Sequence, residues 1–343
     1  MRDDVRQTRS HLIELFEQHG LHPRTMFGQN FLIDLNVIDS IVRAADLSPA
    51  DVVLEVGAGT GSMTTSLSTW AGRVVSVEID RDMYALATEA VAKRTNVRLL
   101  NQDALKSKNT LAPEVIDAVR SGLREVSKQL GRPPRLKLVS NLPYSVATPV
   151  VSNLIATDLP WERMVMTIQY ELGLRMAAKP STSNYGALGV WCQAHGRVEI
   201  LRKLGPKVFW PRPGVDSAVV RIIRDKSRVR RMKDRAFFHD YARRVFQNRR
   251  KTLRSVLSAM VRKQLSKPQV DAFLAANDLT ETSRADTLDV ATHIRIANAL
   301  QRRLADDGEQ PATPPSEAIE ADTDAGDAGP SDAATARPAD PED

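Results

Sequence analysis

The chain has 343 residues, 42% of them hydrophobic, which suffices for one large domain and a smaller one. No apolar run approaches the roughly 18 residues of a membrane span, and no signal-peptide core follows the charge at Arg2, so we expect a cytoplasmic protein without a membrane partner. The net charge of +6 hides an asymmetry, because residues 306–343 carry 12 acidic residues and one basic residue, which leaves a net charge of +17 on the rest of the chain.

The N-terminal part predicts two short helices with an interruption between them. Residues 10–20 have the spacing of an amphipathic helix, with Ser10 as its cap and Gly20 at its end. The motif FGQNFL occupies residues 27–32, and a second helical pattern follows over residues 36–46.

Five apolar, β-branched runs come next and alternate with helical stretches. They read DVVLEVGAGTG, RVVSVEID, NVRLLNQDA, RLKLVSNLPY and RMVMTIQ. Strands that are apolar on both faces and separated by helices predict an α/β fold with a parallel sheet covered on both sides. Two further runs, over residues 197–204 and 215–224, have no long helix between them and predict a hairpin that closes the sheet.

Two features between these strands have a simpler interpretation. Residues 106–134 form a long, polar, partly helical insertion between the third and fourth strands, to which we assign no function. The single cysteine, Cys192, excludes an internal disulfide and a zinc site built on cysteines. Beside Trp191 in an apolar run, it is expected to be a buried structural thiol.

The chain divides into three predicted parts. Residues 1–224 hold the N-terminal segment and the sheet. Residues 225–305 show helical patterns only, over 234–246, 248–263, 268–276 and 287–304. Residues 306–343 have almost no large apolar side chain, so we expect a disordered acidic tail.

Polar or glycine residues stand at the carboxyl ends of four consecutive predicted strands. Gly57 opens a Gly-x-Gly-x-Gly turn after the first strand, and Glu78, Asp103 and Asn141 end the next three. In an open α/β sheet the ligand crevice lies at this edge. Each residue alone would be explained as a helix cap or a turn, but four at successive strand ends favour a binding site.

The pattern also narrows the ligand. The glycine turn lacks the spacing of the NAD fingerprint, and the Lys-Ser/Thr pair of a phosphate-binding loop is absent. Acidic strand ends suit a ligand with a ribose and an adenine but no pyrophosphate. S-adenosylmethionine fits this description.

The fourth strand stops abruptly at the motif NLPY, residues 141–144. A tight turn would explain the asparagine and the proline. The alternative is that the amide of Asn141, a backbone carbonyl on the side of Pro143 and the ring of Tyr144 together hold a flat heterocycle.

With these motifs together, the chain from about residue 25 to residue 303 resembles the 16S ribosomal RNA adenine dimethyltransferases, which modify two adjacent adenosines near the 3′ end of the small-subunit RNA. The motifs that carry the resemblance are FGQNFL, EVGAGTG, VEID, NQDA, NLPY, YGALGV, FWPRPGVDSAVVR and RRKTLR. The stretch FQNRRKTLR favours the small-subunit type over the macrolide-resistance enzymes that act on 23S RNA. The resemblance implies a Rossmann-like S-adenosylmethionine-dependent methyltransferase sheet with a small all-α C-terminal domain.

Carried over by motif, the resemblance assigns roles to individual residues. It implies that the cofactor is bound by Asn30, Leu32, Gly57, Glu78, Asp103 and Asn141. It implies that the reaction depends on Asn141, Pro143 and Tyr144, with Tyr144 stacked on the target base. Two departures bear on RNA contacts: Tyr170 stands in QYE where the family usually has a basic residue, and the 106–134 stretch is longer than usual.

The chemistry of the target supports these roles. The exocyclic amine of adenine is a poor nucleophile because its lone pair is delocalised into the ring. If Asn141 and the carbonyl on the Pro143 side accept its two hydrogens, the nitrogen becomes pyramidal and its lone pair points at the methyl group. The target base must leave its stack to reach the site. We expect no metal, no covalent intermediate and no strong general base, since the work is mainly alignment.

Basic stretches over residues 224–235 and 243–254 are interpreted as RNA contacts, with Arg249, Arg250 and Lys251 as candidates, although a solvated helix face would also explain single arginines. The expected partner is 16S RNA in the small ribosomal subunit or its precursor, bound by a monomer. Phe209 and Trp210 are expected either to shape the wall of the RNA cleft or to pack between domains. The alternatives are a 23S adenine methyltransferase and a non-catalytic ribosome-assembly factor.

Overall fold

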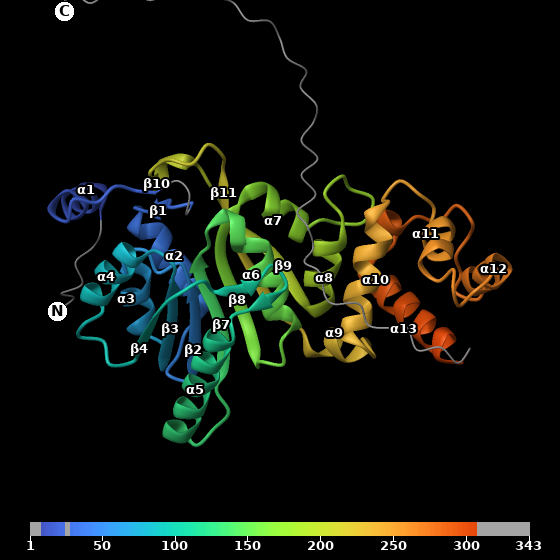
Figure 1. Ribbon diagram of the computed structural model, residues 1–343, viewed down its shortest axis with the longest axis horizontal. Coiled ribbons are helices and arrows are strands. Elements are labelled where there is room, and N and C mark those ends of the chain that lie inside the picture. The colour runs from blue at the N-terminus through green and yellow to red at the C-terminus, as the bar shows by residue number, and fades with distance from the viewer. Residues whose placement is uncertain (1–7, 25–27, 307–343) are drawn as a thin grey trace, which may run out of the picture.

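A computed structural model describes residues 8–24 and 28–306 of the chain (Figure 1). The predicted disorder of the acidic tail therefore lies outside the described residues, apart from Asp306, which ends a helix. The first residue of FGQNFL, Phe27, lies outside them as well.

The centre of the fold is a seven-stranded sheet in the order β4-β3-β2-β7-β8-β11-β9. The first five strands in this order are parallel, and β11 runs antiparallel to both β8 and β9. Both the parallel sheet and the closing hairpin are thereby confirmed. The strands are β2 (Asp51–Val56), β3 (Arg73–Glu78), β4 (Val97–Asn101), β7 (Arg135–Asn141), β8 (Trp161–Gln169), β9 (Gly196–Leu204) and β11 (Ser217–Arg224).

Helices cover both faces of this sheet because its central strands β3, β2, β7 and β8 are largely buried on both sides. Every residue of β2 is buried, and its side chains alternate between two hydrophobic clusters. Val53 packs in the cluster with α2 and α3, whereas Val52 and Leu54 pack in the one with α5, α6 and α8. The helices are α2 (Leu35–Ala45), α3 (Ser62–Ser68), α4 (Arg81–Ala90), α5 (Pro113–Leu130), α6 (Tyr144–Ala156), α7 (Tyr170–Met176) and α8 (Ala187–His195).

Residues 106–134 are partly helical, as predicted, but the prediction that they form an insertion is wrong. After the short strands β5 (Leu105–Ser107) and β6 (Thr110–Leu111), this stretch forms α5, which buries Val115, Val119 and Val126 against β2 and β3. The chain has to cross from β4 at the edge to β7 in the middle of the sheet, and a parallel pair needs such a crossover helix. Its polar outer face hid the buried stripe in the sequence.

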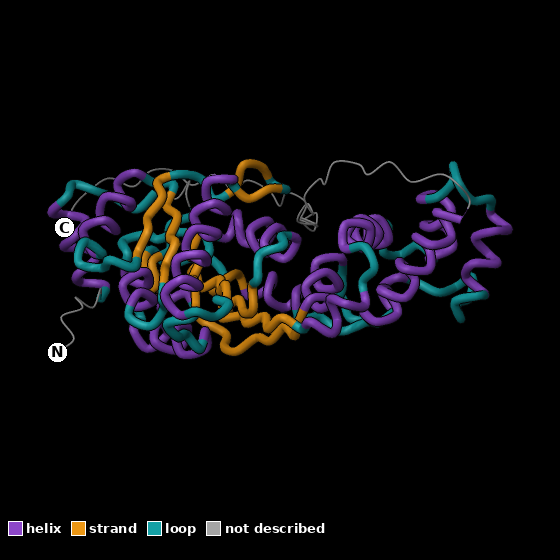
Figure 2. Tube along the Cα trace, turned by 90° about the horizontal axis from the view of Figure 1, so that it is seen from below, coloured by secondary structure: helices purple, strands orange, loops and turns teal. Residues whose placement is uncertain are grey.

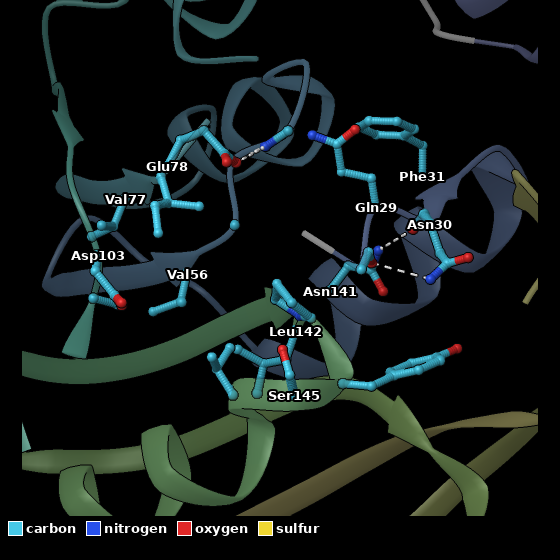
Figure 3. A pocket seen from close by; sticks show the side chains of 18 of the residues that line it. Gln29, Asn30, Phe31, Val56, Val77, Glu78, Asp103, Asn141, Leu142 and Ser145 are labelled. Carbon is cyan, nitrogen blue, oxygen red and sulfur yellow. Dashed lines mark hydrogen bonds between the residues drawn. The ribbon is translucent and has the colours of Figure 1, made fainter. Parts of the chain in front are cut away.

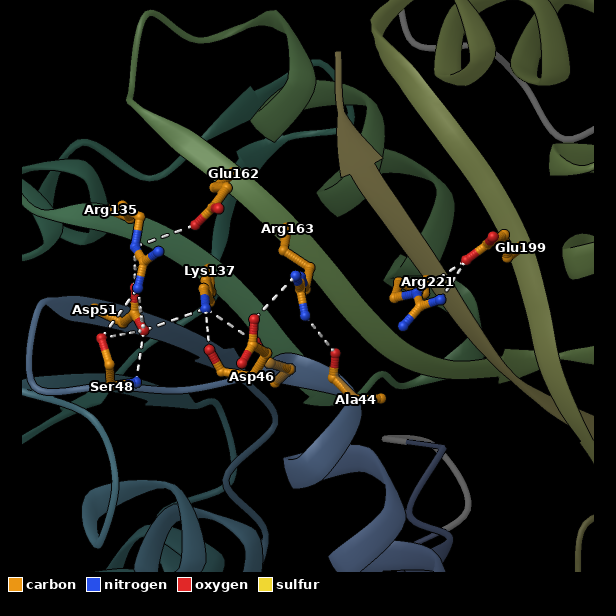
Figure 4. Close-up of polar contacts among 11 residues, drawn as sticks. Ala44, Asp46, Ser48, Asp51, Arg135, Lys137, Glu162, Arg163, Glu199 and Arg221 are labelled. Carbon is orange, nitrogen blue, oxygen red and sulfur yellow. Dashed lines mark hydrogen bonds and ion pairs between the residues drawn. The ribbon is translucent and has the colours of Figure 1, made fainter.

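A buried polar network lies at the amino ends of the central strands, opposite the carboxyl ends where the candidate site is expected (Figure 4). Lys137 is only 1% exposed, and its ammonium donates to the carbonyls of Ala45 and Asp46 and lies 3.2 Å from Asp51. Arg135 pairs with the same carboxylate at 2.8 Å. The network joins the end of α2 to β2 and β7, so it fixes the sheet whose other edge carries the candidate site.

The N-terminal segment packs across the carboxyl end of the sheet through aromatic rings. Helix α1 (Arg9–Gln18) is capped by Thr8 rather than by Ser10 as predicted, because Thr8 accepts from the backbone of His11. Phe16 of this helix makes an edge contact with Trp210, with ring centroids 5.3 Å apart.

The same segment adds a small second sheet, in which β1 (Phe31–Leu32) pairs with β10 (Phe209–Trp210). Phe209 and Trp210 do not pack between domains. Phe209 is buried in the same cluster as the apolar side of α2, and Trp210 packs against the N-terminal segment. A role in the wall of an RNA cleft stays a prediction.

The C-terminal part is helical, as predicted, and extends from one end of the molecule (Figure 2). Helices α10 and α13 pack on α8, so the hydrophobic core continues from the sheet into this part. The helices are α9 (Lys226–Arg231), α10 (Arg235–Gln247), α11 (Leu253–Met260), α12 (Lys267–Ala275) and α13 (Val290–Asp306). Helix α9 was not predicted, and α11 starts at Leu253 rather than at residue 248 because Thr252 caps it.

Cys192 is fully buried in α8, as expected of a structural thiol. Among the helices of the described ranges, none combines the length and apolar character that crossing a bilayer requires.

Candidate active site

The polar strand ends predicted from the sequence meet in one pocket of about 250 Å³ (Figure 3). Gly57, Glu78, Asp103 and Asn141 all line it, at the carboxyl ends of β2, β3, β4 and β7. The parallel register brings these ends to one edge, as the prediction required. Asn30, Pro143 and Tyr144 line the same pocket.

The glycine turn after β2 needs glycine at its first two glycine positions for two reasons. Gly57 and Gly59 have φ angles of +85° and +55°, which side chains with a Cβ rarely adopt. A Cβ on Gly57 would stand 3.2 Å from the ring of Pro143, and one on Gly59 would stand 3.1 Å from the ring of Phe31. Side chains here would therefore fill the space between the turn and the opposite wall of the pocket.

Glu78 presents a carboxylate held in place by backbone donors. Its Oε2 accepts from the N–H of Gly59 at 2.8 Å, and its Oε1 accepts from the N–H of Asp80 at 3.0 Å. Burial raises the pKa of Glu78, while these two hydrogen bonds counteract the shift by stabilising the anion. A carboxylate accepts up to about four hydrogen bonds, so Glu78 has capacity left for hydroxyl donors.

The chemistry of the pocket fits S-adenosylmethionine. Glu78 and Asp103 offer acceptors for ribose hydroxyls and an adenine amine, and Val77 and Ile79 offer apolar contacts. The residues of the described chain that line the pocket include no lysine or arginine, which a pyrophosphate ligand would call for. The glycine turn leaves room for the ligand to lie against the backbone.

The side chain of Asn141 has one orientation. Its Nδ2 donates to the backbone carbonyl of Asn30 at 2.8 Å (Figure 3). A carbonyl can only accept, so the amide nitrogen must face Asn30 and the Oδ1 is turned away as an acceptor. Asn30 is itself tied down, because its side chain donates to the carbonyl of Gly28 at 3.1 Å.

Tyr144 follows Pro143 at the first position of α6, and its ring is half-buried at the pocket wall. Its hydroxyl lies 2.5 Å from the Oγ of Ser217 on β11. Burial raises the pKa of Tyr144, so the phenol stays neutral at physiological pH. The ring of Tyr144 is therefore uncharged, and its hydroxyl end is held by Ser217.

Residues that sequence reasoning missed complete the pocket and its supports. Gln29 donates to Asp80 at 2.9 Å and accepts from the backbone N–H of Arg24 at 2.7 Å, which ties the N-terminal segment to the turn after β3. Ile79 and Gln102 line the pocket next to Glu78 and Asp103. The missed lining residues are Gly28, Gln29, Phe31, Val56, Gly59, Val77, Ile79, Gln102, Ala104, Leu142, Ser145 and Val146. Those that adjoin a predicted site residue could have been found by extending each strand end by one position.

Leu32 does not line the pocket. Its side chain is 7% exposed and packs in the core with Phe209, the residue opposite it in the small sheet. Its predicted contact with the cofactor stays a prediction.

The three RNA candidates differ in their surroundings. Arg249 donates to the carbonyls of Thr182 and Ser183 and pairs with Asp286 at 3.4 Å, so its guanidinium is engaged within the protein. Arg250 and Lys251 are exposed in the turn between α10 and α11. The three lie outside the pocket.

Comparisons with known proteins agree with this geometry. The family model described as ribosomal RNA adenine dimethylase matches residues 20–300. A protein named ribosomal RNA small subunit methyltransferase A from Moorella thermoacetica is 35% identical over 289 residues, which cover 84% of this chain and 96% of that protein. A protein of the same name from Pelotomaculum thermopropionicum is 37% identical over 247 residues, which cover 72% of this chain and 81% of that protein.

Solved structures show the same fold. A dimethyladenosine transferase from Plasmodium falciparum superposes with a TM-score of 0.63 at 22% identity, over 80% of this chain and 97% of that one. The 23S rRNA methyltransferase ErmE gives a TM-score of 0.56 at 22% identity, over 79% and 99%. With a family model over most of its length and relatives above one-third identity, this chain belongs to the ribosomal RNA adenine dimethylase family and is an S-adenosylmethionine-dependent methyltransferase.

Proposed function

We propose that the protein dimethylates the N6 amines of two adjacent adenosines near the 3′ end of 16S ribosomal RNA, in the small ribosomal subunit or its precursor. The observation that carries this proposal is the fixed amide of Asn141, whose oxygen is turned away from Asn30 in a pocket that Tyr144 also lines. The names of the relatives, ribosomal RNA small subunit methyltransferase A, support the small subunit over the large one.

In this proposal the cofactor site comprises Asn30, Gly57, Glu78, Asp103 and Asn141, and the contact of Leu32 stays a prediction. Glu78 accepts from ribose hydroxyls, Asp103 accepts from the adenine amine, and Gly57 lets the methionine end lie against the backbone. S-adenosylmethionine supplies a methyl group already activated on a sulfonium. The task of the protein is then to hold the target amine in line with that group.

Asn141 and the Leu142–Pro143 peptide hold the amine. The Oδ1 of Asn141 accepts one hydrogen, and the carbonyl of Leu142 accepts the other, so the nitrogen becomes pyramidal and its lone pair is released from the ring. Pro143 fixes this carbonyl, since its φ of −56° is set by its own ring. Proline also has no N–H, so the backbone offers no donor here that would compete for the lone pair of the target nitrogen.

Tyr144 holds the extruded base. A stacked aromatic ring contributes about 1–3 kcal/mol per base, which offsets part of the cost of unstacking. The bond to Ser217 keeps the ring from rotating away. Because two methyl groups are added, the site must admit an amine that already carries one of them.

The remaining surface is assigned to the RNA. We propose that residues 1–224 are the catalytic domain, that residues 225–305 form an RNA-binding domain and that residues 306–343 are a tail outside both. Arg250 and Lys251 are exposed and suited to phosphate contacts, whereas Arg249 would act through the turn that it holds. We further propose that the protein acts as a monomer in the cytoplasm.

The proposal is tested by mapping the product. Small subunits that lack the modification are incubated with the protein and labelled S-adenosylmethionine, and 23S RNA is treated in parallel. We expect dimethyladenosine at two adjacent positions near the 3′ end of 16S RNA. Label in 23S RNA alone would instead assign the protein to the large subunit.

A further inference from the structure

Next to the pocket, an exposed lysine is held over an aromatic ring. The ammonium of Lys203, near the end of β9, lies 4.7 Å from the centre of the Tyr170 ring at the start of α7. Its Nζ also pairs with the carboxylate of Asp216 at 2.7 Å. The side chain of Lys203 is 53% exposed, so the charge is positioned from two sides and still open to solvent.

A short series of contacts joins Lys203 and Tyr170 to Tyr144, which lines the pocket. The backbone N–H of Tyr170 donates to the carbonyl of Asp216 at 2.9 Å. The next residue, Ser217, pairs in register with Gln169 and bonds the hydroxyl of Tyr144. Lys203 and Tyr170 therefore lie at the same edge of the sheet as Tyr144, on the side where the target base enters in the proposed function.

The distribution of charge around the pocket indicates that Lys203 binds a phosphate. The pocket itself is lined by the carboxylates of Glu78 and Asp103, which repel the backbone of an incoming nucleic acid. Residues 202–215, which end β9 and lead to β11, carry the opposite charge, with the exposed cations Arg202, Lys203, Lys207 and Arg212 and no acidic residue. An extruded nucleotide brings its two flanking phosphates to the pocket rim, where a cation is needed.

Stability alone does not account for the arrangement. An ion pair with both partners this exposed, Asp216 being 40% exposed, contributes little to the free energy of unfolding. What the ring and the carboxylate do is restrict a flexible side chain to one direction before RNA arrives. A cation restricted in this way loses less entropy when it binds a phosphate.

We propose that Lys203, positioned by Tyr170 and Asp216, binds a phosphate of the RNA backbone next to the extruded adenosine. This inference rests on the proposed function. Lys203 is then a residue of the substrate site, and Tyr170 is a positioning residue that acts through it. When the RNA binds, the ammonium of Lys203 either leaves the carboxylate of Asp216 for the phosphate or contacts both.

The test compares steady-state kinetics of six proteins on small subunits that lack the modification, between 50 and 200 mM KCl. They are the wild type, Lys203→Gln, Lys203→Arg, Tyr170→Leu, the double variant of Lys203→Gln and Tyr170→Leu, and the control Lys128→Gln, which alters an exposed lysine in the last turn of α5. The readouts are KM for the particle, kcat, and the dissociation constant of S-adenosylhomocysteine.

We expect Lys203→Gln to raise KM about three- to tenfold, with kcat within about twofold and the affinity for S-adenosylhomocysteine unchanged. Its salt slope should fall by about 0.7–0.9, the value for one phosphate. Lys203→Arg should retain the KM of the wild type, and Tyr170→Leu should raise KM in the same direction. Adding Tyr170→Leu to Lys203→Gln should have no further effect, because both changes remove one contact.

Two results overturn the inference, and they distinguish its own failure from that of the proposed function. If the wild type methylates 16S RNA but Lys203→Gln has the KM and salt slope of Lys128→Gln, then Lys203 does not bind the RNA. If the wild type methylates no adenosine in 16S RNA, the proposed function is refuted and this inference with it.

Discussion

The side-chain nitrogen of Asn141 lies 2.8 Å from the backbone carbonyl of Asn30, to which it donates. The two residues are 111 positions apart in the chain, and their contact joins the N-terminal segment to the end of β7. It leaves the amide oxygen of Asn141 as the acceptor, and it does so before any substrate is present. The N-terminal segment thereby orients the side chain on which the proposed reaction depends.

The first prediction concerns this orientation. Asn141→Asp keeps an acceptor oxygen and the shape of the side chain, but it cannot donate to Asn30 and places an anion against a carbonyl. We expect kcat to fall by about 10²-fold or more, comparable to the loss of one aligned hydrogen bond in a transition state. The measurement is single-turnover methylation with saturating cofactor.

A matched control lies on α6, where Asn153 also donates to a backbone carbonyl, that of Lys108, at 3.2 Å. Asn153→Asp should leave kcat unchanged because this residue does not line the pocket. An Asn141→Asp protein with the rate of the wild type would show that the donor to Asn30 is dispensable.

The second prediction separates the ring of Tyr144 from its hydroxyl. Tyr144→Ala should reduce methyl transfer about 10²-fold, since a loss of about 1–3 kcal/mol of stacking adds to poor alignment of the amine. Tyr144→Phe keeps the ring and loses only the bond to Ser217, so we expect a reduction of about tenfold or less. Calorimetric titration with S-adenosylhomocysteine should give affinities within a few-fold of the wild type for both variants. A Tyr144→Ala protein that loses the cofactor but turns over normally at saturation would contradict the stacking role.

The third prediction is a pH effect on stability. Glu55 on β2 is fully buried and accepts from Thr64 and Ser76, and burial raises its pKa to about 7. Because the folded pKa lies above the unfolded value of 4.5, the folded protein binds this proton more tightly. The resulting stability is present below pH 4.5 and is lost as the pH rises through about 7.

Glu55→Gln should remove this dependence, because the amide stays neutral at every pH. Between pH 5 and pH 8 we expect the free energy of unfolding of the wild type to fall by about 2–3 kcal/mol relative to the variant. Urea unfolding at both pH values measures the difference. Parallel pH profiles for the two proteins would mean that Glu55 is ionised throughout.

The fourth prediction divides the basic turn after α10. Arg250→Gln and Lys251→Gln should weaken particle binding and lower the salt slope by about 0.7–0.9 each, without changing stability. Arg249→Gln should instead lower the melting temperature, because it leaves the carbonyls of Thr182 and Ser183 and the 9%-exposed carboxylate of Asp286 with fewer donors. Equal salt slopes and equal melting temperatures for the three variants would show that the turn acts as one surface.

Much of the site could be predicted from the sequence, because each residue at a strand end follows a largely apolar run of strand type. Strand order then brings Gly57, Glu78, Asp103 and Asn141 to one edge without further information. Pattern reasoning fails where the partner is distant in the chain. Nothing near Tyr144 points to Ser217, and nothing near Asn141 points to the carbonyl of Asn30.

The wrong predictions about the fold have local causes. The sequence hides the role of α5 because the exposed face of this helix is rich in charge. Helix α11 was predicted too early because residues 248–252 continue a basic, helix-like pattern, whereas Thr252 accepts from Ser255 and starts the helix there. A charged side chain can also be engaged within the protein, as Arg249 is, and composition cannot distinguish it from an exposed one.

The most direct test of the account is methyl incorporation from labelled S-adenosylmethionine into unmodified small subunits, with Asn141→Ala as the control and 23S RNA as the competing substrate. Nucleosides from each RNA are resolved after digestion. We expect labelled dimethyladenosine in 16S RNA with the wild type, none in 23S RNA, and almost none in either RNA with Asn141→Ala. Equal labelling by Asn141→Ala, or no labelling of 16S RNA by a wild type that still binds S-adenosylhomocysteine, would contradict it.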